Sequence, residues 1–224
     1  MSHRRILTSY CPGLVALLVV LFTAPFAQAG GGKTIPIAKP LRSAFASTQV
    51  WPLTRGQRIV YHYTRERVHP GSADSVSDRA EGYDTLVVES LVDSERGKIA
   101  AIHDPLHRRD AGFEFTAVYL FEDSSVSVEG TQNRRVEQFR FPIKQGATWG
   151  RDPDHPAGGD KYVWKSEGLS VAETALGRYE AWKLRYRSDL EQITRWFVPG
   201  VGIVREEVRP VTGGVAYVME LASR

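Results

Sequence analysis

A β-hairpin signal near the C-terminus constrains the fold of this chain more than any other stretch. Residues 195–208 read RWFVPGVGIVREEV, and apolar side chains lead into and away from the pair Pro199-Gly200. Proline pre-sets φ for the second position of a β-turn and glycine accepts a positive φ at the third, so this pair predicts a tight reversal between two strands. Gly202 allows a bulge just beyond the turn. The stretch therefore indicates β-sheet and says little about chemistry.

Further strand signals recur along the chain at short intervals. Alternating apolar and polar residues, bounded by turn residues, predict about ten strands and no helix longer than a turn or two. The clearest strand runs over 113–121, where aromatic residues alternate with mixed ones. Residues 69–82 and 151–160 are rich in loop-forming residues and are expected to be loops. The pattern predicts an all-β fold, either a curved antiparallel sheet or a half-open β-barrel.

The first 29 residues have the form of a secretory signal peptide. Arg4 and Arg5 precede an apolar run from Leu14 to Phe26, and Ala27-Gln28-Ala29 is a small-x-small cleavage site. The run is shorter than the roughly 20 residues that a membrane span needs, and no later stretch is apolar enough to span. We therefore expect cleavage near Ala29 and a periplasmic or secreted mature chain without a membrane span.

The rest of the chain is expected to form one domain. Residues 30–50 open with three glycines and read as a flexible leader. Residues 51–224 then make a single β domain, which is long enough to bury its own core. Two similar entries, WPLTRG from Trp51 and FPIKQG from Phe141, predict a repeat of two halves, 51–140 and 141–224.

Charge and cysteine content bear on the class of function. The chain has 29 basic and 26 acidic side chains, and removal of Arg4 and Arg5 leaves 27 basic against 26 acidic ones. This balance lacks the electrostatic footprint of a nucleic-acid-binding protein, so we expect no nucleic-acid partner. The single cysteine, Cys11, precedes the apolar run. The mature chain is therefore expected to contain neither disulfides nor a cysteine-ligated metal.

Three motifs in the second half resemble the TapB-like group of exported bacterial β-rich proteins of unknown function. They are FPIKQGATW from Phe141, ETALGRYEA from Glu173 and WFVPGVGIV from Trp196. Ala175 stands where that group usually has proline. The resemblance covers residues 141–209 well and reaches the first half through the Trp51 entry. It implies a curved antiparallel sheet of the kind that can enclose an apolar ligand, and it implies no activity.

Two polar stretches are candidates for metal-assisted chemistry. The first contains His103, His107 and Asp110, whose imidazoles and carboxylate are ligand types for zinc or another divalent ion. Pro105 between the histidines disfavours the helix that would place both on one metal. The second stretch, 152–160, collects aspartates and a histidine without the frame of a calcium loop. A hydrolase using one of these stretches is the enzymatic alternative, whereas our main interpretation is polar loops, no metal and no cofactor.

Aromatic side chains that alternate along the predicted strands are the remaining lead. They are core if the sheet closes tightly, and they line an apolar groove if it stays open. The groove candidates are Tyr61, Tyr63, Phe113, Phe115, Tyr119, Trp164, Trp182 and Trp196. We single out no catalytic residue, because the chain contains no Gly-x-Ser-x-Gly elbow.

The sequence as a whole therefore predicts a non-enzymatic binding or scaffold module of the cell envelope. Its partner is expected to be an apolar small molecule or an envelope protein. A metal-assisted hydrolase and a purely structural envelope component stay open as alternatives. The sequence does not determine the oligomeric state.

Overall fold

The computed structural model describes residues 34–35, 47–68, 76–103, 116–129 and 135–224. These residues belong to one compact unit that spans Gly32–Arg224. The helix found among them is a single turn, α1 (Ser47–Val50). The strands are β1 (Thr34–Ile35), β2 (Arg58–Val68), β3 (Val76–Ser94), β4 (Gly97–His103), β5 (Thr116–Glu122), β6 (Ser125–Glu129), β7 (Arg135–Arg140), β8 (Thr148–Trp149), β9 (Trp164–Thr174), β10 (Gly177–Arg187), β11 (Glu191–Val198), β12 (Gly202–Pro210) and β13 (Gly214–Ser223).

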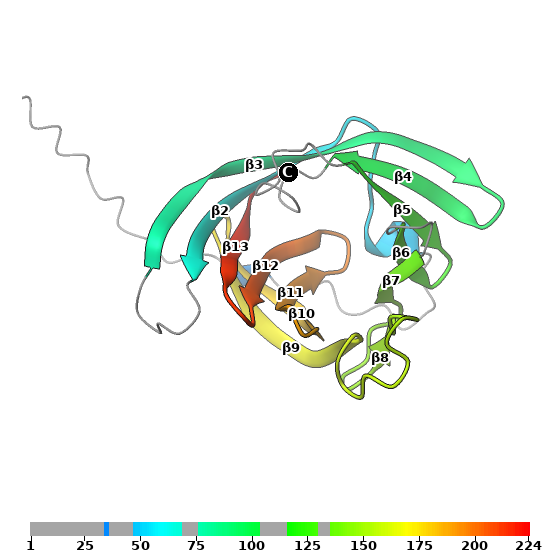
Figure 1. The fold of residues 1–224 in the computed structure, drawn as a ribbon. Helices are drawn as coiled ribbons and strands as arrows, with labels where there is room; N and C mark the ends of the chain where they lie inside the picture. Colours follow the sequence, from blue (N-terminus) through cyan, green and yellow to red (C-terminus); the bar gives the residue numbers. More distant parts are fainter. Residues whose placement is uncertain (1–33, 36–46, 69–75, 104–115, 130–134) are drawn as a thin grey trace, which may run out of the picture. The chain divides into compact units, whose positions relative to one another are not determined.

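The strands from β2 to β13 form one antiparallel sheet that curls into a nearly closed barrel with one unsealed seam (Figure 1). Their order is β7-β6-β5-β4-β3-β2-β13-β12-β11-β10-β9-β8, so strands that follow one another in the chain are neighbours except β7 and β8, which stand at the two ends of the order. Pairing of β13 with β2 joins the two halves of this order and leaves the seam between β7 and β8. β1 pairs with β10 in parallel, outside this order. The prediction of an all-β, half-open barrel is confirmed, with more strands than the ten expected.

The hairpin predicted around Pro199-Gly200 forms at the expected place. β11 ends at Val198 and β12 begins at Gly202, and the register shifts between Trp196 and Phe197. The amide of Val201 donates a hydrogen bond to the carbonyl oxygen of Val198 over 2.9 Å, which closes the turn. The turn thereby places β11 and β12 side by side in the sheet.

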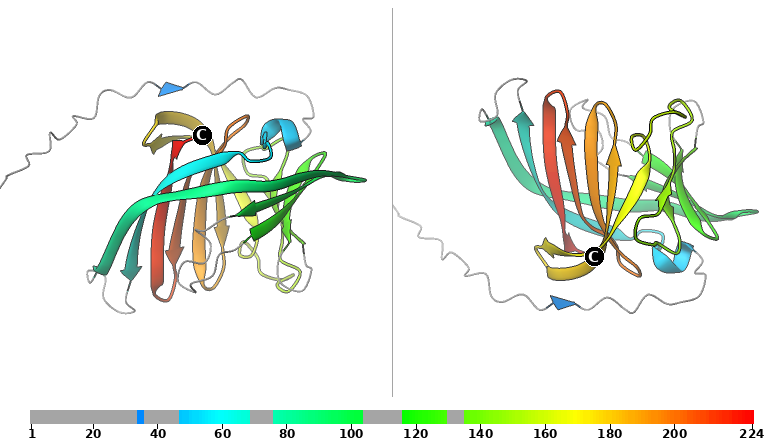
Figure 2. Two further views of the ribbon diagram at one scale, coloured as in Figure 1. Left: turned by 90° about the horizontal axis from the view of Figure 1, so that it is seen from above. Right: turned by 90° about the horizontal axis from the view of Figure 1, so that it is seen from below.

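β3 is longer than the sequence indicates, and the expectation of a loop over 69–82 is wrong for residues 76–82. They pair with β2 from Val68↔Val76 to Tyr63↔Gly82. Pairing with a long neighbouring strand outweighs the low strand propensity of their Ser, Asp and Gly residues. In Figure 2, β2 and β3 sweep across the strands from β9 to β13.

Two short elements lie within residues 30–50, the stretch expected to be a flexible leader. Within 30–50, residues 34–35 form β1 and residues 47–50 form α1. The hydroxyl of Ser47 donates a hydrogen bond to the carbonyl oxygen of Glu122, which ties α1 to the end of β5. The expected signal peptide, residues 1–29, lies outside the described residues.

The end of the barrel beside α1 is filled with aromatic rings. Trp51, which follows α1 directly, is 2% exposed. Its ring meets four others edge-on, at centroid distances between 5.4 and 6.3 Å: Tyr119, Phe121, Phe139 and Phe197. Edge-on contacts of this kind add to the free energy gained by burial. We call this the α1 end of the barrel, and we call the end with the turns at 188–190 and 211–213 the opposite end.

The turns that follow the two proline-containing entries are alike, although Phe141-Pro142 is a cis peptide bond and Trp51-Pro52 is not. Trp51 and Phe141 are both buried. In each following turn an amide donates to the carbonyl oxygen three residues earlier, Gln57 to Thr54 over 3.0 Å and Ala147 to Lys144 over 3.1 Å. The first entry leads into β2 and the second into β8. The repeat of whole halves stays a prediction.

Candidate functional site

The seam between β7 and β8 is bridged by a side chain. The indole Nε1–H of Trp149, on β8, donates a hydrogen bond to the carbonyl oxygen of Gln138, on β7, over 3.0 Å. Gly150 follows β8, and a Cβ there would lie 2.1 Å from the carbonyl oxygen of Glu137. The backbones of β7 and of the segment 149–150 therefore approach closely at the seam, which fixes the position of β7 relative to β8.

Two rows of directly opposed residues cross the inner face from β9 to β2. Residues opposite one another in antiparallel strands point to the same side of a sheet, so each row shares a face. The row nearer the α1 end, here the charged row, consists of Ser166, Leu184, Arg195, Glu206, Met219 and Tyr63. The next row toward the opposite end, here the tyrosine row, consists of Trp164, Tyr186, Ile193, Val208, Tyr217 and Arg65.

A buried ion pair forms the centre of the charged row. Arg195 is 4% exposed and Glu206 is fully buried. The guanidinium donates through Nε to the carboxylate of Glu206, and through Nη1 to Oε1 of Gln138 over 2.7 Å. The hydroxyl of Tyr217 donates to the other carboxylate oxygen of Glu206 over 3.1 Å. These contacts connect β7, β11, β12 and β13 through the interior of the barrel.

The environment of Arg195 keeps its guanidinium charged. Burial by itself acts to lower the pKa of Arg195, but the charge of Glu206 and the hydrogen bond to it outweigh that effect, so the pKa is raised. The Cζ atom lies 4.5 Å from the centre of the Trp164 ring, which is a cation–π contact. The inner face therefore carries a fixed positive group at Arg195, held between Glu206 and an indole ring.

Two buried polar atoms on β9, next to this ion pair, have no hydrogen-bond partner within the described part of the chain. They are Nε1 of Trp164 and Oγ of Ser166. Both residues are at most 2% exposed. An unmet hydrogen-bonding group in the interior costs free energy, commonly about 1–3 kcal/mol. Most buried polar groups in proteins have a hydrogen-bond partner, so the unmet Trp164 and Ser166 atoms are exceptions to the usual pattern.

The tyrosine row is more accessible than the charged row. Trp164 and Val208 are buried in it, whereas Tyr186, Ile193 and Tyr217 are half-buried. Burial, helped by the charges of Asp152 and Glu191, raises the pKa of the Tyr186 phenol to about 12. Tyr186, Ile193 and Tyr217 are thus only partly shielded from solvent, and the Tyr186 phenol stays neutral at physiological pH.

The structure separates the groove candidates predicted from the sequence. Tyr61, Tyr119 and Trp164 are buried, while Tyr63 and Trp182 are half-buried and pack against the core. Phe113 and Phe115 lie outside the described residues. Trp196 is opposite Lys183 and Arg205, whose charged groups lie 5.9 and 5.5 Å from its ring, and it therefore belongs to the outer face.

The candidate metal ligands are only partly described. His103 ends β4, and His107 and Asp110 lie outside the described residues. In the stretch 152–160, the ring of His155 stacks on Tyr162 with centroids 3.7 Å apart. Across the described ranges, no three His, Cys, Asp or Glu side chains gather as the ligands of a metal would.

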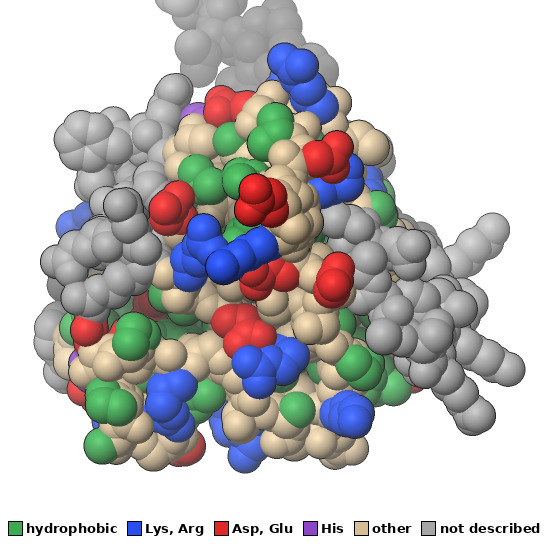
Figure 3. Space-filling view, turned by 90° about the vertical axis from the view of Figure 1, so that its right-hand side faces the viewer, with side chains coloured by type: hydrophobic (Ala, Val, Ile, Leu, Met, Phe, Trp, Pro, Cys, Tyr) green, Lys and Arg blue, Asp and Glu red, His purple; other side chains and the backbone are tan. Residues whose placement is uncertain are grey.

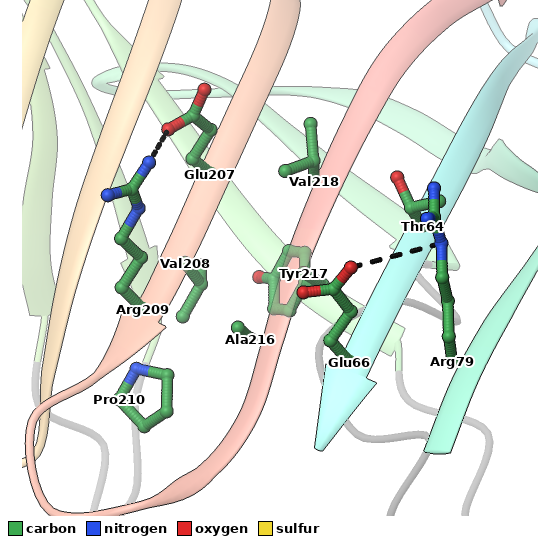
Figure 4. Close-up of a pocket in the computed structure, with 10 residues that line it drawn as sticks. All are labelled: Thr64, Glu66, Arg79, Glu207, Val208, Arg209, Pro210, Ala216, Tyr217 and Val218. Carbon is green, nitrogen blue, oxygen red and sulfur yellow. Dashed lines mark hydrogen bonds and ion pairs between the residues drawn. The ribbon is translucent and has the colours of Figure 1, made fainter. Parts of the chain in front are cut away.

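A groove of about 400 Å³ lies over β2, β3, β12 and β13, and its lining includes Val208 and Tyr217 of the tyrosine row (Figure 4). It lies near Val208 and Tyr217, which are the last pair of residues that β12 and β13 share before the two strands separate. Glu207 pairs with Arg209 over 3.2 Å on one side, and Glu66 pairs with Arg79 over 3.8 Å on the other. The groove therefore carries paired charges of both signs on its two sides.

A smaller pocket of about 250 Å³ lies at the α1 end, lined by Trp51, Pro52, Leu53, Leu91, Lys98 and Phe121. Its volume is below the usual range of drug-sized ligand sites, roughly 300–1,000 Å³. Figure 3 shows the side of the sheet on the right in Figure 1, where acidic and basic side chains alternate with hydrophobic ones. Neither the small pocket nor this mixed face favours one class of ligand.

The buried polar residues of the charged row are absent from the residues singled out in the sequence. Arg195 lies between Ile193 and Phe197, and Glu206 lies between Val204 and Val208, in strands that otherwise turn apolar residues inward. A charged residue at an inward position of an alternating strand is the signal that could have identified both. The register that brings them together is not visible in either strand alone.

Among the described residues, no helix has the length and apolar character needed to cross a membrane. No protein-family model matches the chain, and no curated protein matches it. The TapB-like resemblance therefore stays a prediction.

Two crystal structures each match about three quarters of the chain. One is a candidate exported protein with a YmcC-like fold from Bacteroides fragilis, with 13% identity and a TM-score of 0.41, in which the match covers 76% of this chain and 96% of that one. The other is a candidate lipoprotein from Parabacteroides distasonis, with 9% identity and a TM-score of 0.43, covering 77% of this chain and 96% of that one.

Proposed function

We propose that the protein is a non-enzymatic binding module of the cell envelope that holds an apolar ligand against the tyrosine row. The observation that carries this proposal is the change in exposure along the inner face. The α1 end is packed with rings, whereas Tyr186, Ile193 and Tyr217 are half-buried. A ligand that covers these side chains removes apolar surface from water, worth about 25 cal/mol for each Å².

The chemistry of the row supports an apolar ligand with few polar groups. Ile193 and the ring faces of Tyr186 and Tyr217 offer hydrocarbon surface, and Val208 lies between Ile193 and Tyr217 in the row. The rings and the ion pair nearer the α1 end are buried and provide a packed floor. The expected export of the chain, from residues 1–29, places such a module in the envelope. The TapB-like resemblance is in keeping with this location and adds no activity.

The test is a titration of the protein with N-phenyl-1-naphthylamine, a neutral apolar fluorophore whose emission rises in apolar surroundings. Ile193→Glu places a charge on the inner face, and we expect it to weaken binding at least about tenfold, since a carboxylate resists burial without a partner. Gln192→Glu is the matched control, because Gln192 lies on the same strand and is opposite Arg187 and Arg209.

The control variant is expected to bind the fluorophore as the wild type does, and both variants should unfold cooperatively. Equal binding by the two variants, or no saturable binding by the wild type, would contradict the proposal. The second result would return attention to the structural-component alternative. The hydrolase alternative has its own test, which is metal analysis of the purified protein before and after His103→Ala with His107→Ala.

A further inference from the structure

We infer that the bound ligand carries a terminal carboxylate, and that this group accepts hydrogen bonds from Nε1 of Trp164 and Oγ of Ser166 beside the guanidinium of Arg195. The inference rests on the proposed function and names the class of its ligand, a long-chain carboxylate. It begins from Trp164 and Ser166, which carry two of the three buried donors that have no partner among the described residues; the third is Nε1 of Trp51.

The two donors lie together on one strand. Trp164 and Ser166 are two residues apart on β9, so their side chains emerge on the same face. Trp164 belongs to the tyrosine row and Ser166 to the charged row. A group that meets both atoms therefore spans the boundary between the packed interior and the accessible part of the inner face.

The ring edge of Trp164 lies close to the seam. A Cβ on Gly150 would lie 3.4 Å from Cδ1 of Trp164, the atom bonded to Nε1. The amide of Ser166 donates to the carbonyl oxygen of Ala147 over 2.9 Å, which holds this part of β9 against the segment that leads into β8. Both residues are thus anchored by backbone contacts while their polar side-chain atoms stay unmatched.

Arg195 supplies the charge that favours an anion at this position. Its guanidinium lies 4.5 Å from the Trp164 ring centre. The strand order here is β12-β11-β10-β9. Arg195 on β11 therefore lies between Glu206 on β12 and the two donors on β9. An incoming carboxylate on the β9 side therefore approaches the cation away from Glu206. A carboxylate has only acceptor atoms, which suits one N–H and one O–H donor.

The alkyl chain of such a ligand has a continuous path along the tyrosine row. The ring centroid of Tyr186 lies 5.3 Å from that of Trp164. Ile193 is opposite Tyr186 on the next strand, and both side chains are half-buried. The carboxylate at Trp164 and the chain over Tyr186 and Ile193 therefore fit one molecule.

The inference predicts opposite effects on stability and binding, which a purely structural role would not produce. Ser166→Ala removes an unmatched buried hydroxyl, so the ligand-free protein should melt about 2–4 °C higher. The same change should weaken palmitate binding about tenfold or more, the size that a hydrogen bond to a charged group commonly has. Trp164→Phe should weaken palmitate binding similarly, because it deletes Nε1 and keeps a ring.

Ser170→Ala is the matched control on the same strand. The hydroxyl of Ser170 accepts a hydrogen bond from Nε1 of Trp196 over 3.0 Å, so this variant should melt lower and bind palmitate normally. N-phenyl-1-naphthylamine has no carboxylate, and its binding should survive both Ser166→Ala and Trp164→Phe. Hexadecyltrimethylammonium, with the same chain length as palmitate and a cationic head, should bind far more weakly to the wild type.

Two results would overturn the inference. The first is a wild type that binds the fluorophore but not palmitate, which leaves the proposed function standing. The second is palmitate affinity unchanged in Ser166→Ala, and that variant remains informative if Trp164→Phe does not fold. If Ser166→Ala also melts lower in that second case, the hydroxyl is assigned to a buried water. Loss of binding for both probes in the wild type would instead contradict the proposed function.

Discussion

Arg195 and Glu206 are the residues on which the inner face depends most. A buried ion pair loses much of its electrostatic gain to the cost of removing both charges from water, so its net contribution to stability is small. Removing one partner is different, because the remaining charge is left buried. Here Glu206 is fully buried and also accepts from Tyr217, so neither group can reach water without disrupting the strands.

We therefore expect Arg195→Met to lower the free energy of unfolding by about 3–5 kcal/mol. The double variant Arg195→Met with Glu206→Met should recover most of that loss, because it leaves no unpaired charge. Urea denaturation of the three proteins measures both effects. Lys98→Ala is the surface control, since Lys98 and Asp93 have side chains that are 39% and 86% exposed, and it should cost less than about 1 kcal/mol. A double variant as unstable as the single one would refute this account of the pair.

Tyr186 gives the protein a defined response to alkaline pH. Its pKa is raised to about 12, mainly by burial, whereas a tyrosine in an unfolded chain titrates near 10. The unfolded state therefore releases its proton first as the pH rises. The stabilising contribution of the neutral phenol is fully present below pH 10 and is lost between about pH 10 and 12.

Tyr186→Phe should make the free energy of unfolding fall less steeply between pH 10 and 12 than it does in the wild type. Guanidinium denaturation at pH 9 and at pH 11.5 gives the two points needed. Tyr83→Phe is a suitable control, because Tyr83 is 69% exposed, and it should keep the wild-type slope. Identical slopes for wild type and Tyr186→Phe would mean that the phenol does not stay neutral in the folded protein at these pH values.

At the scale of elements, the turn between β11 and β12 holds the α1 end closed. The amide of Gly200 donates to the carbonyl oxygen of Val50 over 2.6 Å, which links this turn to α1. Gly202 has φ +111, and a Cβ there would lie 2.5 Å from Nε1 of Trp51. The absence of a side chain at this position is what lets the Trp51 ring lie against the start of β12.

Two alanine substitutions in this turn separate backbone strain from crowding. Gly200 has φ +80 and open space where a Cβ would lie, so Gly200→Ala should cost only the strain of a positive φ, about 1–2 kcal/mol. Gly202→Ala should cost a further amount of about 1–3 kcal/mol, because the new methyl group displaces Trp51. Urea denaturation followed by tryptophan fluorescence tests this order. Equal losses would show that Trp51 adjusts freely.

The sequence was informative about strands and turns and uninformative about how they meet. Pro199-Gly200 predicted the hairpin of β11 and β12, because a turn signal of this kind is local. The strand over 76–82 was missed, since its pairing with β2 overrides its composition. Local signals therefore sufficed for the fold class and the position of several strands.

The candidate site could not be predicted, because it arises from contacts between distant strands. Gln138 meets Arg195 across the interior over 2.7 Å, although 57 residues separate them in the chain. Trp164 and Ser166 are notable only because nothing in the described part of the chain satisfies their polar atoms. Neither the composition of a strand nor the spacing of its residues can indicate that a buried side chain will lack a hydrogen-bond partner.

At the scale of the whole described unit, the sheet has two unlike ends and one seam. The α1 end is packed with aromatic rings, and the inner face becomes accessible at the tyrosine row. Pairing of β13 with β2 secures the barrel on one side, and side-chain contacts such as Trp149 with Gln138 bridge it on the other. This arrangement offers an apolar ligand an accessible part of the inner face with a rigid floor.

Native mass spectrometry of the protein, purified from its cells without detergent, tests the ligand-binding account most directly. We predict a reproducible extra mass that disappears on denaturation, extracts into organic solvent and is absent from Ile193→Glu but present in Gln192→Glu. A bare mass for the wild type, or the same extra mass in both variants, would contradict the claim that the tyrosine row holds an apolar ligand.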